Sequence, residues 1–420
     1  MERAAVVGVW AKGAGPQAEA SLAELKRLLE TAGGTAVSEV VQERPRPDPA
    51  TLLGRGKAEE IANLSRQEKL SAVVIDAELS PTQQRNLQDI VPAKIIDRTR
   101  LILDIFAQRA RTREGKLQVE LAQLNYMLPR ATEKFGRFEQ QTGGIGTRGP
   151  GERKLEISQR RIRDRIARLR QEIENVGRQR ALRRENRRRT PLPLIALVGY
   201  TNAGKSTLLN ALHTSRAPDV YADDRLFATL DPTTRRIKLP GGRVALLVDT
   251  VGFIQNLPHH LVAAFRATLE EARDADLLLH IVDAADPAGP AHAEVVIDVL
   301  TELGAAELPR ITVHNKADAL TPAQRAQHGR RGDVLVSART GLGLPALLRT
   351  LEGRLDASLE ERTVFLPHAR RDLLPLFYAA GRVLGEAPVP GGTRLRAMLG
   401  ADNWGRFERA LTEKEKGTTR

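Results

Sequence analysis

The feature that most constrains this chain is the phosphate-binding pattern G-x-x-x-x-G-K-S, which begins at Gly199 directly after the apolar run 194–198. In a strand-loop-helix context this pattern predicts a loop folded around a polyphosphate. Its glycines turn backbone N–H groups toward the phosphates, Lys205 supplies an ammonium, and Ser206 offers a hydroxyl to Mg²⁺. The candidate phosphate-binding residues are Gly199, Tyr200, Thr201, Asn202, Ala203, Gly204, Lys205, Ser206 and Thr207. We predict that the chain binds a nucleotide; a chance match in an ordinary turn is the alternative.

A second motif follows the next apolar strand, 244–248. It reads Asp249-Thr250-Val251-Gly252. The phosphate-binding pattern is called a P-loop. A carboxylate at the carboxyl end of the strand one βα unit after a P-loop is placed to hold Mg²⁺ through water. The amide of Gly252 can approach the terminal phosphate. This pattern is common alone but specific after a P-loop.

A third motif indicates which base is bound. The strand 311–314 leads into Asn315-Lys316-Ala317-Asp318. The Asp318 carboxylate can accept two hydrogen bonds, from N1–H and the 2-amino group of guanine, and adenine lacks that donor pair. A further strand, 334–336, ends at Ser337-Ala338-Arg339, whose backbone can contact the guanine O6. The sequence therefore predicts GTP rather than ATP.

Composition limits the remaining possibilities. With 420 residues the chain should form two to four domains. It contains no cysteine, which excludes disulfides, Fe–S clusters, thiolate zinc sites and cysteine nucleophiles, and indicates a reducing compartment, by default the cytoplasm. No apolar stretch approaches the length of a membrane span, and the first residues do not resemble a secretion signal. We expect a monomer that is neither secreted nor membrane-spanning.

The alternation of apolar and helical segments predicts an α/β fold. Short strands at 4–9, 72–75 and 93–96 alternate with helical segments, which favours a small α/β domain with a parallel sheet. The predicted domains are an N-terminal α/β domain at 1–112, a basic helical hairpin at 113–190, a GTPase domain at 191–357 and a small C-terminal domain at 358–420.

The middle segment carries much of the net charge of +13: residues 152–190 contain 15 Arg/Lys and 6 Asp/Glu. Such density indicates attraction to nucleic acid or another anionic surface, with a solvated helix face as the alternative. Leucines at helical spacing over 117–128 and an apolar seam over 155–176 predict two antiparallel helices with the arginines outward. The glycine-rich segment 143–151 between them should form the tip of the hairpin, or a plain linker.

These motifs resemble those of the translation-factor-like P-loop GTPases, and the stretch 226–235, LFATLDPTTR, narrows the resemblance to the HflX family. Other similar segments are 54–57, 79–81, 85–87, 97–99, 118–124 and the glycine-rich tip followed by 151–152. The resemblance covers about residues 1–365. Arg153-Lys154 and Ala131 differ from the residues usual in the family at these positions. Both differences lie in the predicted helical hairpin, 113–190, which we call the arm.

The resemblance implies a GTPase that associates with the large ribosomal subunit and splits stalled or idle ribosomes under stress, with the arm contacting rRNA toward the peptidyl-transferase region. It also implies that Thr229 completes the Mg²⁺ shell in the presence of the γ-phosphate. The further candidate nucleotide-binding residues are Phe227, Ala228, Thr229, Leu230 and Asp231. The candidate catalytic residues are Lys205, Thr229 and Gly252, and the candidate metal ligands are Ser206, Thr229 and Asp249.

Two positions refine the expected chemistry. Phe253 stands where many small GTPases have a glutamine that orients water, so intrinsic hydrolysis should be slow and stimulated by the ribosome. In some related GTPases an asparagine at the position of Asn202 helps to hold K⁺, although a small polar turn residue is an equally good explanation.

Two other functions stay open. The first is an NTP-dependent RNA-remodelling protein in which the basic arm acts on RNA and nucleotide hydrolysis, with ATP at the N-terminal domain as one option, drives strand rearrangement. The turn 52–57 in that domain is by itself only a weak anion-site candidate, with an ordinary tight turn as the alternative. No helicase motif set supports it. The second is a membrane-surface regulator recruited by the arginines, for which the sequence offers no amphipathic anchor.

Overall fold

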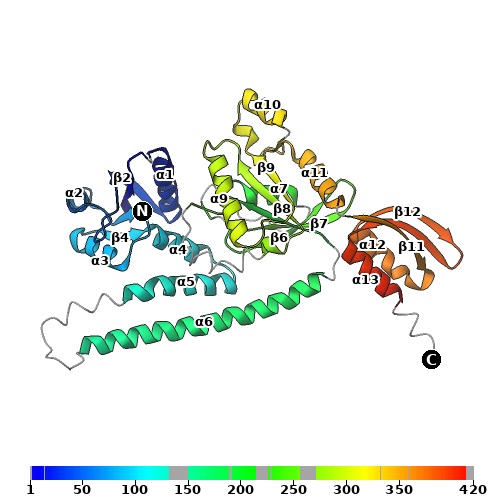
Figure 1. Cartoon of the computed structure of the whole chain (residues 1–420), viewed down its shortest axis with the longest axis horizontal. Coiled ribbons are helices and arrows are strands. Elements are labelled where there is room, and N and C mark those ends of the chain that lie inside the picture. Colours follow the sequence, from blue (N-terminus) through cyan, green and yellow to red (C-terminus); the bar gives the residue numbers. More distant parts are fainter. Residues whose placement is uncertain are drawn as a thin grey trace. The chain divides into compact units, whose positions relative to one another are not determined.

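A computed structural model describes residues 2–13, 15–131, 150–188, 192–213, 226–227, 229–255, 271–331, 333–357 and 359–412. The chain divides into two compact units (Figure 1). The first comprises 1–177 with 223–231 and 252–268, and the second comprises 178–222, 232–251 and 269–420. No helix among the described residues combines the length and apolar character needed to cross a bilayer.

The first unit is built on a four-stranded parallel sheet in the order β2-β1-β3-β4. Its core strands are almost uniformly apolar because both faces of a parallel sheet are buried. The elements are β1 (Glu2–Trp10), α1 (Gly15–Thr31), β2 (Gly34–Glu43), α2 (Arg55–Gln67), β3 (Ala72–Ile75), α3 (Pro81–Ile90), β4 (Lys94–Asp97) and α4 (Arg98–Arg109). The predicted α/β class and parallel sheet are confirmed.

Sequence analysis missed strand β2. This strand lies at the edge of the sheet, and its residues alternate largely between exposed and less exposed positions. It therefore lacks the continuous apolar run by which the inner strands were recognised.

Two helices, α5 (Arg113–Ala131) and α6 (Pro150–Arg188), form the predicted antiparallel pair (Figure 1). Arg165 on α6 donates two hydrogen bonds to Glu120 on α5, at 2.7 and 2.8 Å. Arg113, at the start of α5, approaches Glu172 further along α6 at 3.7 Å, so the helices run in opposite directions. The apolar seam faces inward at Ile166 and Leu169, whereas the α6 arginines at 161, 163, 168 and 170 are exposed. Of the predicted tip, 143–151, residues 143–149 lie outside the described residues. The prediction was wrong for 150–151, which form the start of α6 because proline is tolerated at the first position of a helix.

The second unit contains a six-stranded sheet in the order β10-β9-β8-β5-β7-β6, in which only the β6–β7 pair is antiparallel. Its strands are β5 (Leu194–Gly199), β6 (Thr233–Lys238), β7 (Val244–Asp249), β8 (Leu277–Asp283), β9 (Arg310–Asn315) and β10 (Val334–Leu335). The helices are α7 (Lys205–Leu212), α9 (Gly289–Glu302), η2 (Ala317–Ala319), α10 (Pro322–Arg331) and α11 (Leu344–Asp356).

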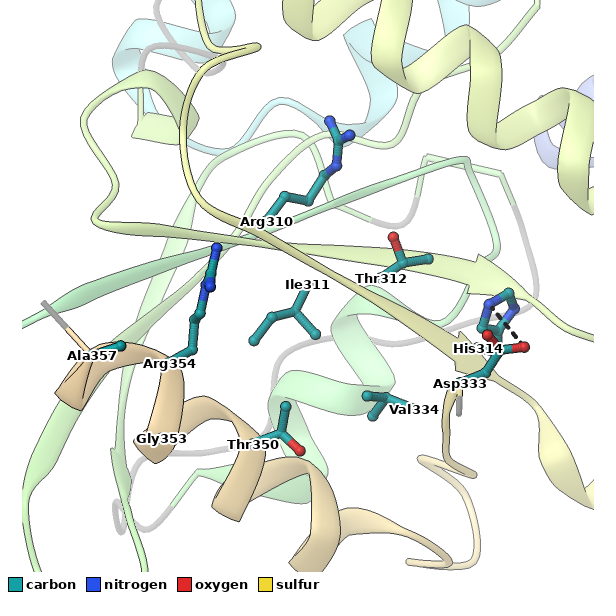
Figure 2. Close-up of a pocket in the computed structure, with 10 residues that line it drawn as sticks. All are labelled: Arg310, Ile311, Thr312, His314, Asp333, Val334, Thr350, Gly353, Arg354 and Ala357. Carbon is teal, nitrogen blue, oxygen red and sulfur yellow. Dashed lines mark ion pairs between the residues drawn. The ribbon is translucent and has the colours of Figure 1, made fainter. Parts of the chain in front are cut away.

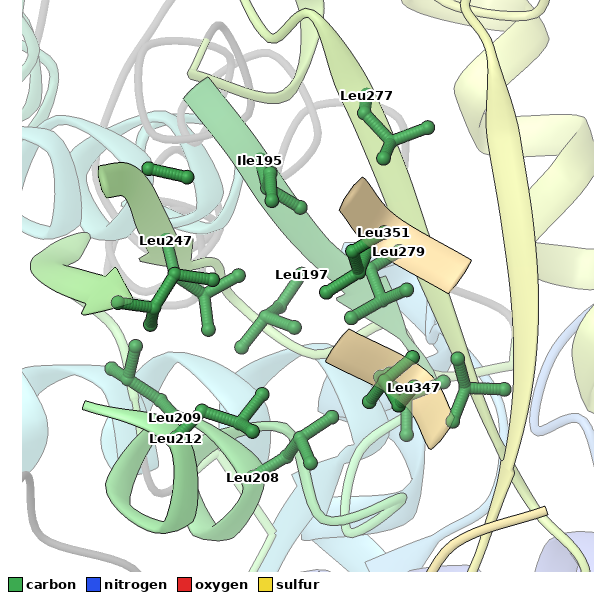
Figure 3. Packing of buried hydrophobic residues seen from close by; sticks show 14 of the residues in the cluster. Ile195, Leu197, Leu208, Leu209, Leu212, Leu247, Leu277, Leu279, Leu347 and Leu351 are labelled. Atoms are coloured by element: carbon green, nitrogen blue, oxygen red, sulfur yellow. The ribbon is translucent and has the colours of Figure 1, made fainter. Parts of the chain in front are cut away.

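One hydrophobic core fixes this sheet to its helices. Leu197 and Leu279, from neighbouring strands, pack with Leu209 of α7 and with Leu347 and Leu351 of α11 (Figure 3). All five side chains are fully buried. Because β5 and α7 are both anchored in this core, the loop that joins them has rigid supports on each side.

The C-terminal residues form a small α+β module with its own core. An antiparallel sheet in the order β11-β13-β12 packs against Phe377, Trp404 and Phe407, and the two phenylalanine rings stack with centroids 4.0 Å apart. Its elements are β11 (Glu360–Pro367), η3 (His368–Leu373), α12 (Leu374–Ala380), β12 (Arg382–Val389), β13 (Gly392–Leu399) and α13 (Ala401–Thr412). The predicted small C-terminal domain has this architecture.

Candidate functional site

The phosphate-binding pattern occupies the turn from β5 into α7, which is the strand-loop-helix context that the sequence predicted. Gly204 has a φ of +92° and caps the N-terminus of α7. A Cβ at this position would also lie 2.2 Å from Nδ2 of Asn315, so both the backbone and the packing require glycine. The helix that follows directs its free N–H groups into the loop, which favours an anion there.

The side chain of Lys205 is folded into the loop. Its Nζ donates to the carbonyl oxygens of Gly199 at 3.0 Å and Tyr200 at 2.8 Å, and the residue is buried. Burial lowers the pKa of Lys205 to about 8, opposed by the nearby Asp249 carboxylate. Lysine therefore loses some of its positive charge in this conformation near neutral pH, and a bound polyphosphate would restore it.

Nucleotide binding should therefore take up a proton at alkaline pH. At pH about 9, roughly one unit above its pKa, most of the Lys205 amine is neutral, and phosphate oxygens raise the pKa again. We expect uptake of close to one proton per GDP bound, measured by calorimetry in two buffers of different ionisation enthalpy. The Lys205→Arg variant is the control, because its guanidinium stays charged at this pH. Equal proton uptake by the variant and the wild type would contradict this assignment.

Ser206 and Asp249 meet beside the loop. Because β5 and β7 are parallel neighbours, with Leu197 opposite Asp249, the carboxylate at the end of β7 reaches the start of α7. Ser206 Oγ donates to Asp249 Oδ2 at 2.6 Å, and both residues are buried. Two hard oxygen donors this close suit Mg²⁺, which binds through a few protein oxygens and keeps water and phosphate ligands. The neighbouring Thr250 hydroxyl donates to the Leu197 carbonyl at 2.6 Å and fixes the end of β7.

Asn315 connects the phosphate loop to the two predicted guanine loops. Its Nδ2 donates to the carbonyl of Ala203 at 2.9 Å, and its Oδ1 accepts from the backbone N–H of Ala338 at 3.0 Å. The side chain is almost completely buried. Three segments that are far apart in the sequence are thus held together by one amide.

Asp318, the residue predicted to recognise the base, is held in place by a hydrogen bond that also favours its ionised form. Its Oδ1 accepts from the Ser337 hydroxyl at 2.7 Å, and this hydrogen bond is the main cause that lowers the pKa of Asp318. Ser337 is itself fixed, because its hydroxyl also accepts from the N–H of Thr340 at 3.2 Å. A half-buried carboxylate that stays ionised is the acceptor that guanine N1–H and the 2-amino group require.

Lys316, which lies between Asn315 and Asp318 in the sequence, has a left-handed backbone conformation, with φ at +64°. Its Nζ pairs with Oδ2 of Asp283 at 2.8 Å, at the carboxyl end of β8. Sequence analysis did not select Asp283. The available signal was its position, since a carboxylate at the end of a central parallel strand lies on the edge where ligands bind.

The candidates at 227–231 and Gly252 belong to the first unit. Phe227 has a φ of +57°, and its ring meets that of Phe106 edge-on, with centroids 4.5 Å apart. Thr229 and Leu230 are buried, as is Gly252. Ala228 lies outside the described residues. The roles of these residues in the nucleotide site remain predictions.

Asp231 accepts several hydrogen bonds from residues before α5. Its Oδ2 accepts from the backbone N–H groups of Arg111 and Thr112, each at 2.9 Å, and its Oδ1 accepts from the Thr112 hydroxyl. Thr112 in turn accepts from the N–H of Gly115 at 3.0 Å, at the start of α5. The carboxylate predicted as a nucleotide contact is therefore bound to the beginning of the helical arm.

Family models and relatives of known name match most of the chain. Three family models match in succession: "GTP-binding GTPase N-terminal" over 19–107, "GTP-binding GTPase Middle Region" over 109–187 and "50S ribosome-binding GTPase" over 194–316. The GTPase HflX of Caldanaerobacter subterraneus is 45% identical over 398 residues, which cover 95% of this chain and 91% of the relative. The chain belongs to the HflX family of GTPases. The GTPase HflX of Escherichia coli is 44% identical over 391 residues, which cover 92% of this chain and 91% of the relative.

Membership of the HflX family confirms the resemblance drawn from the motifs and identifies the protein as a GTPase. Among solved structures, a GTP-binding protein of Sulfolobus solfataricus in complex with GDP matches with a TM-score of 0.44 and 24% identity. The match covers 84% of this chain and 98% of that chain.

Proposed function

We propose that this GTPase binds GTP with Mg²⁺, associates in that state with the large ribosomal subunit through rRNA, and splits or rescues stalled or idle ribosomes. Hydrolysis would then release it. Lys205 would contact the β- and γ-phosphates, and Ser206, Thr229 and Asp249 would hold Mg²⁺, which neutralises charge on the phosphates. Support comes from the ribosome-binding description of the matched GTPase family and from the arginine-rich arm.

The observation that carries the proposal is the bond between Asp231 and the start of the arm. Thr229, the predicted switch residue, is only two positions before Asp231. Asp231 accepts the N–H groups of Arg111 and Thr112, directly before α5. A change at Thr229 on loss of the γ-phosphate would therefore act on the base of the helical pair through one short stretch of chain.

The segment that follows the Asp249–Gly252 motif has a similar connection within the first unit. Arg98 is buried and forms ion pairs with Glu24 and with Asp76, the latter at 2.7 Å. Its Nη2 also donates to the backbone carbonyl of Gln255 at 3.2 Å, three residues after Gly252. The segments that follow Thr229 and Gly252 thus both contact residues of the N-terminal half, which supports a role for this half in responding to the nucleotide state.

The decisive experiment is co-sedimentation of the protein with purified ribosomal subunits. We expect binding to the large subunit with a non-hydrolysable GTP analogue and little binding with GDP. The association constant should fall steeply with salt because the arm releases counterions from rRNA phosphates. Equal binding with both nucleotides would contradict the proposal. Binding to bare duplex RNA with any nucleotide would instead support RNA remodelling, and binding to liposomes would support a membrane-surface regulator.

Hydrolysis itself should depend on the ribosome. Phe253 is buried and has no group that can orient water, so the free protein lacks one usual means of positioning the nucleophile. Single-turnover hydrolysis should be slow for the protein alone and accelerated by ribosomal subunits. Equally fast hydrolysis in both conditions would contradict this part of the proposal. Comparing K⁺ with Na⁺ tests the role of Asn202, which has a φ of +60° in the loop; equal rates would exclude K⁺.

The Asp231 contact predicts a separation of function in Thr112→Val. This nearly isosteric change removes the hydroxyl that bonds Asp231 and accepts from Gly115, while Thr112 has no assigned role in nucleotide binding. We expect GDP affinity close to that of the wild type but a smaller difference between GTP-analogue and GDP states in subunit binding. Thr363→Val, at an exposed position on β11, is the matched control. An unchanged nucleotide dependence in Thr112→Val would refute the coupling.

A further inference from the structure

Three metal-ligating side chains converge in the GTPase domain, outside the phosphate and guanine loops. They are His314 in β9, His328 in α10 and Asp333 directly before β10. His328 Nδ1 lies 2.8 Å from Asp333 Oδ2, and His314 Nε2 lies 3.8 Å from the same oxygen. One ligand atom from each residue lies within 4.8 Å of the others.

The backbone holds these residues together independently of any ion. β9 and β10 are parallel, with Leu335 opposite His314, and this register places Asp333 near His314. The N–H of Asp333 donates to the carbonyl of His328 at 3.2 Å, which ties the end of α10 to the same place. The three side chains are only 23%, 17% and 24% exposed, so their positions are restricted by packing.

A cavity gives access to the cluster. His314 and Asp333 line a cavity of about 580 Å³, together with residues of β9 and α11. Figure 2 shows the two side chains facing each other at one end of this cavity, well separated in this view from Arg354. An ion could enter by this route and complete its coordination with water, which a site with three protein ligands requires.

The ligand set selects the class of ion. Two imidazole nitrogens and one carboxylate oxygen suit first-row divalent transition metals, whereas Mg²⁺ prefers oxygen alone. Adjacent ligands of a tetrahedral Zn²⁺ ion with bonds of about 2.0–2.1 Å lie about 3.4 Å apart, and the observed 2.8 and 3.8 Å lie on either side of this value. Burial lowers the pKa of His314, so its imidazole is neutral and able to bind a metal at physiological pH.

We propose that His314, His328 and Asp333 bind one divalent transition-metal ion of the Zn²⁺ class. The ion would join β9, α10 and the start of β10. His314 directly precedes Asn315, and Asp333 leads through β10 to Ser337. The segment that carries Asp318 is therefore bounded by metal ligands at both ends, and an ion there would hold the guanine loops closed. The alternative is a simple hydrogen-bonded triad in which Asp333 accepts from a histidine and no metal binds.

The test is metal titration of the full chain saturated with Mg²⁺ and GDP. Co²⁺ should bind with one-to-one stoichiometry and produce the visible absorption of a four- or five-coordinate nitrogen-ligated ion, and Zn²⁺ should displace it. We expect dissociation constants in the micromolar range or tighter. His328→Gln and Asp333→Asn should each weaken binding by at least about 100-fold, since loss of even an outer-shell partner costs 10–100-fold. His368→Gln, which removes an exposed histidine of η3 in the C-terminal module, is the matched control.

A second readout separates loss of the site from loss of folding. GDP affinity, measured with Mg²⁺ but without added transition metal, reports whether each variant is folded, because neither the wild type nor the variant then carries the proposed ion. Zn²⁺ at about 100 times its dissociation constant should raise the Tm of the wild type, because an ion that binds only the folded state stabilises it. The same Zn²⁺ concentration is at most about equal to the dissociation constant of folded His328→Gln, so the Tm of this variant should rise far less. The proposal is overturned if the wild type binds no ion, or if His328→Gln and Asp333→Asn bind it as tightly as the wild type.

Discussion

The Asp318→Asn variant should bind GTP about 100- to 10,000-fold more weakly than the wild type. The carboxylate is expected to accept two hydrogen bonds from guanine, each worth about 1.5–3 kcal/mol when one partner is charged. Asparagine keeps one oxygen but directs an amide N–H toward a guanine donor, so one bond is lost and a repulsive contact is added. Because asparagine has nearly the same shape as aspartate, Ser337, which donates to Asp318 Oδ1 at 2.7 Å, can still hydrogen-bond the side chain and hold it in place. Equilibrium titration with a fluorescent GDP analogue measures the effect.

The same variant should gain affinity for a different base. Xanthine carries a carbonyl oxygen in place of the 2-amino group of guanine, and the asparagine amide can donate to it. We expect Asp318→Asn to bind xanthosine diphosphate more tightly than the wild type does. Asp298→Asn, the same change at an exposed position of α9, should alter neither affinity. An equal loss of affinity for both bases would indicate damage to the fold instead of a change in recognition.

The sequence predicted the local structure of the motifs well, because each motif consists of consecutive residues next to one strand. The phosphate loop, the Asp249 motif and the Asp318 motif each occupy a few consecutive residues after a buried strand, and the parallel sheet brings their ends to one edge. The apolar seam of α6 is equally local, since a repeat of 3 and 4 residues indicates one helix face. Composition and pattern were sufficient for these elements.

What sequence could not supply depends on contacts between distant residues. Asp231 was assigned to the nucleotide from its place in a motif, but its carboxylate bonds residues about 120 positions earlier. The metal-ligating cluster has no recognisable spacing, because it arises from the register of β9 against β10 and from the end of α10. The same limit applies to Lys205. Its pKa is lowered because the side chain is buried, and burial of a lysine cannot be predicted from the local sequence pattern.

The start of α6 illustrates a different limit. The sequence Gly149-Pro150-Gly151 favours a loop, yet the helix begins at Pro150. Proline is tolerated at the first position of a helix, where its missing N–H would have no partner and its φ is already suitable. Residues that break a helix interior can therefore mark a helix start, and only the structure distinguishes the two.

Ser206→Ala should reduce single-turnover GTP hydrolysis by about 100-fold or more, equivalent to about 2.7 kcal/mol of transition-state stabilisation. Alanine removes the hydroxyl proposed to bind Mg²⁺. It also removes the donor that lies 2.6 Å from the buried Asp249 carboxylate, which leaves that carboxylate less well satisfied. The variant should thus need much more Mg²⁺ for its residual activity, and it should also lose about 1–3 kcal/mol of stability when no nucleotide is bound.

Ser206→Thr separates these effects from a general disturbance of the loop, because the phosphate-binding pattern accepts either hydroxyl residue at this position. The threonine hydroxyl can still donate to Asp249 and bind the ion, so the Mg²⁺ dependence of hydrolysis should remain close to that of the wild type. If Ser206→Ala and Ser206→Thr lost activity equally, or if Ser206→Ala kept the wild-type Mg²⁺ dependence, the serine hydroxyl would not be a metal ligand. The contact with Asp249 would then serve only to join β7 to α7.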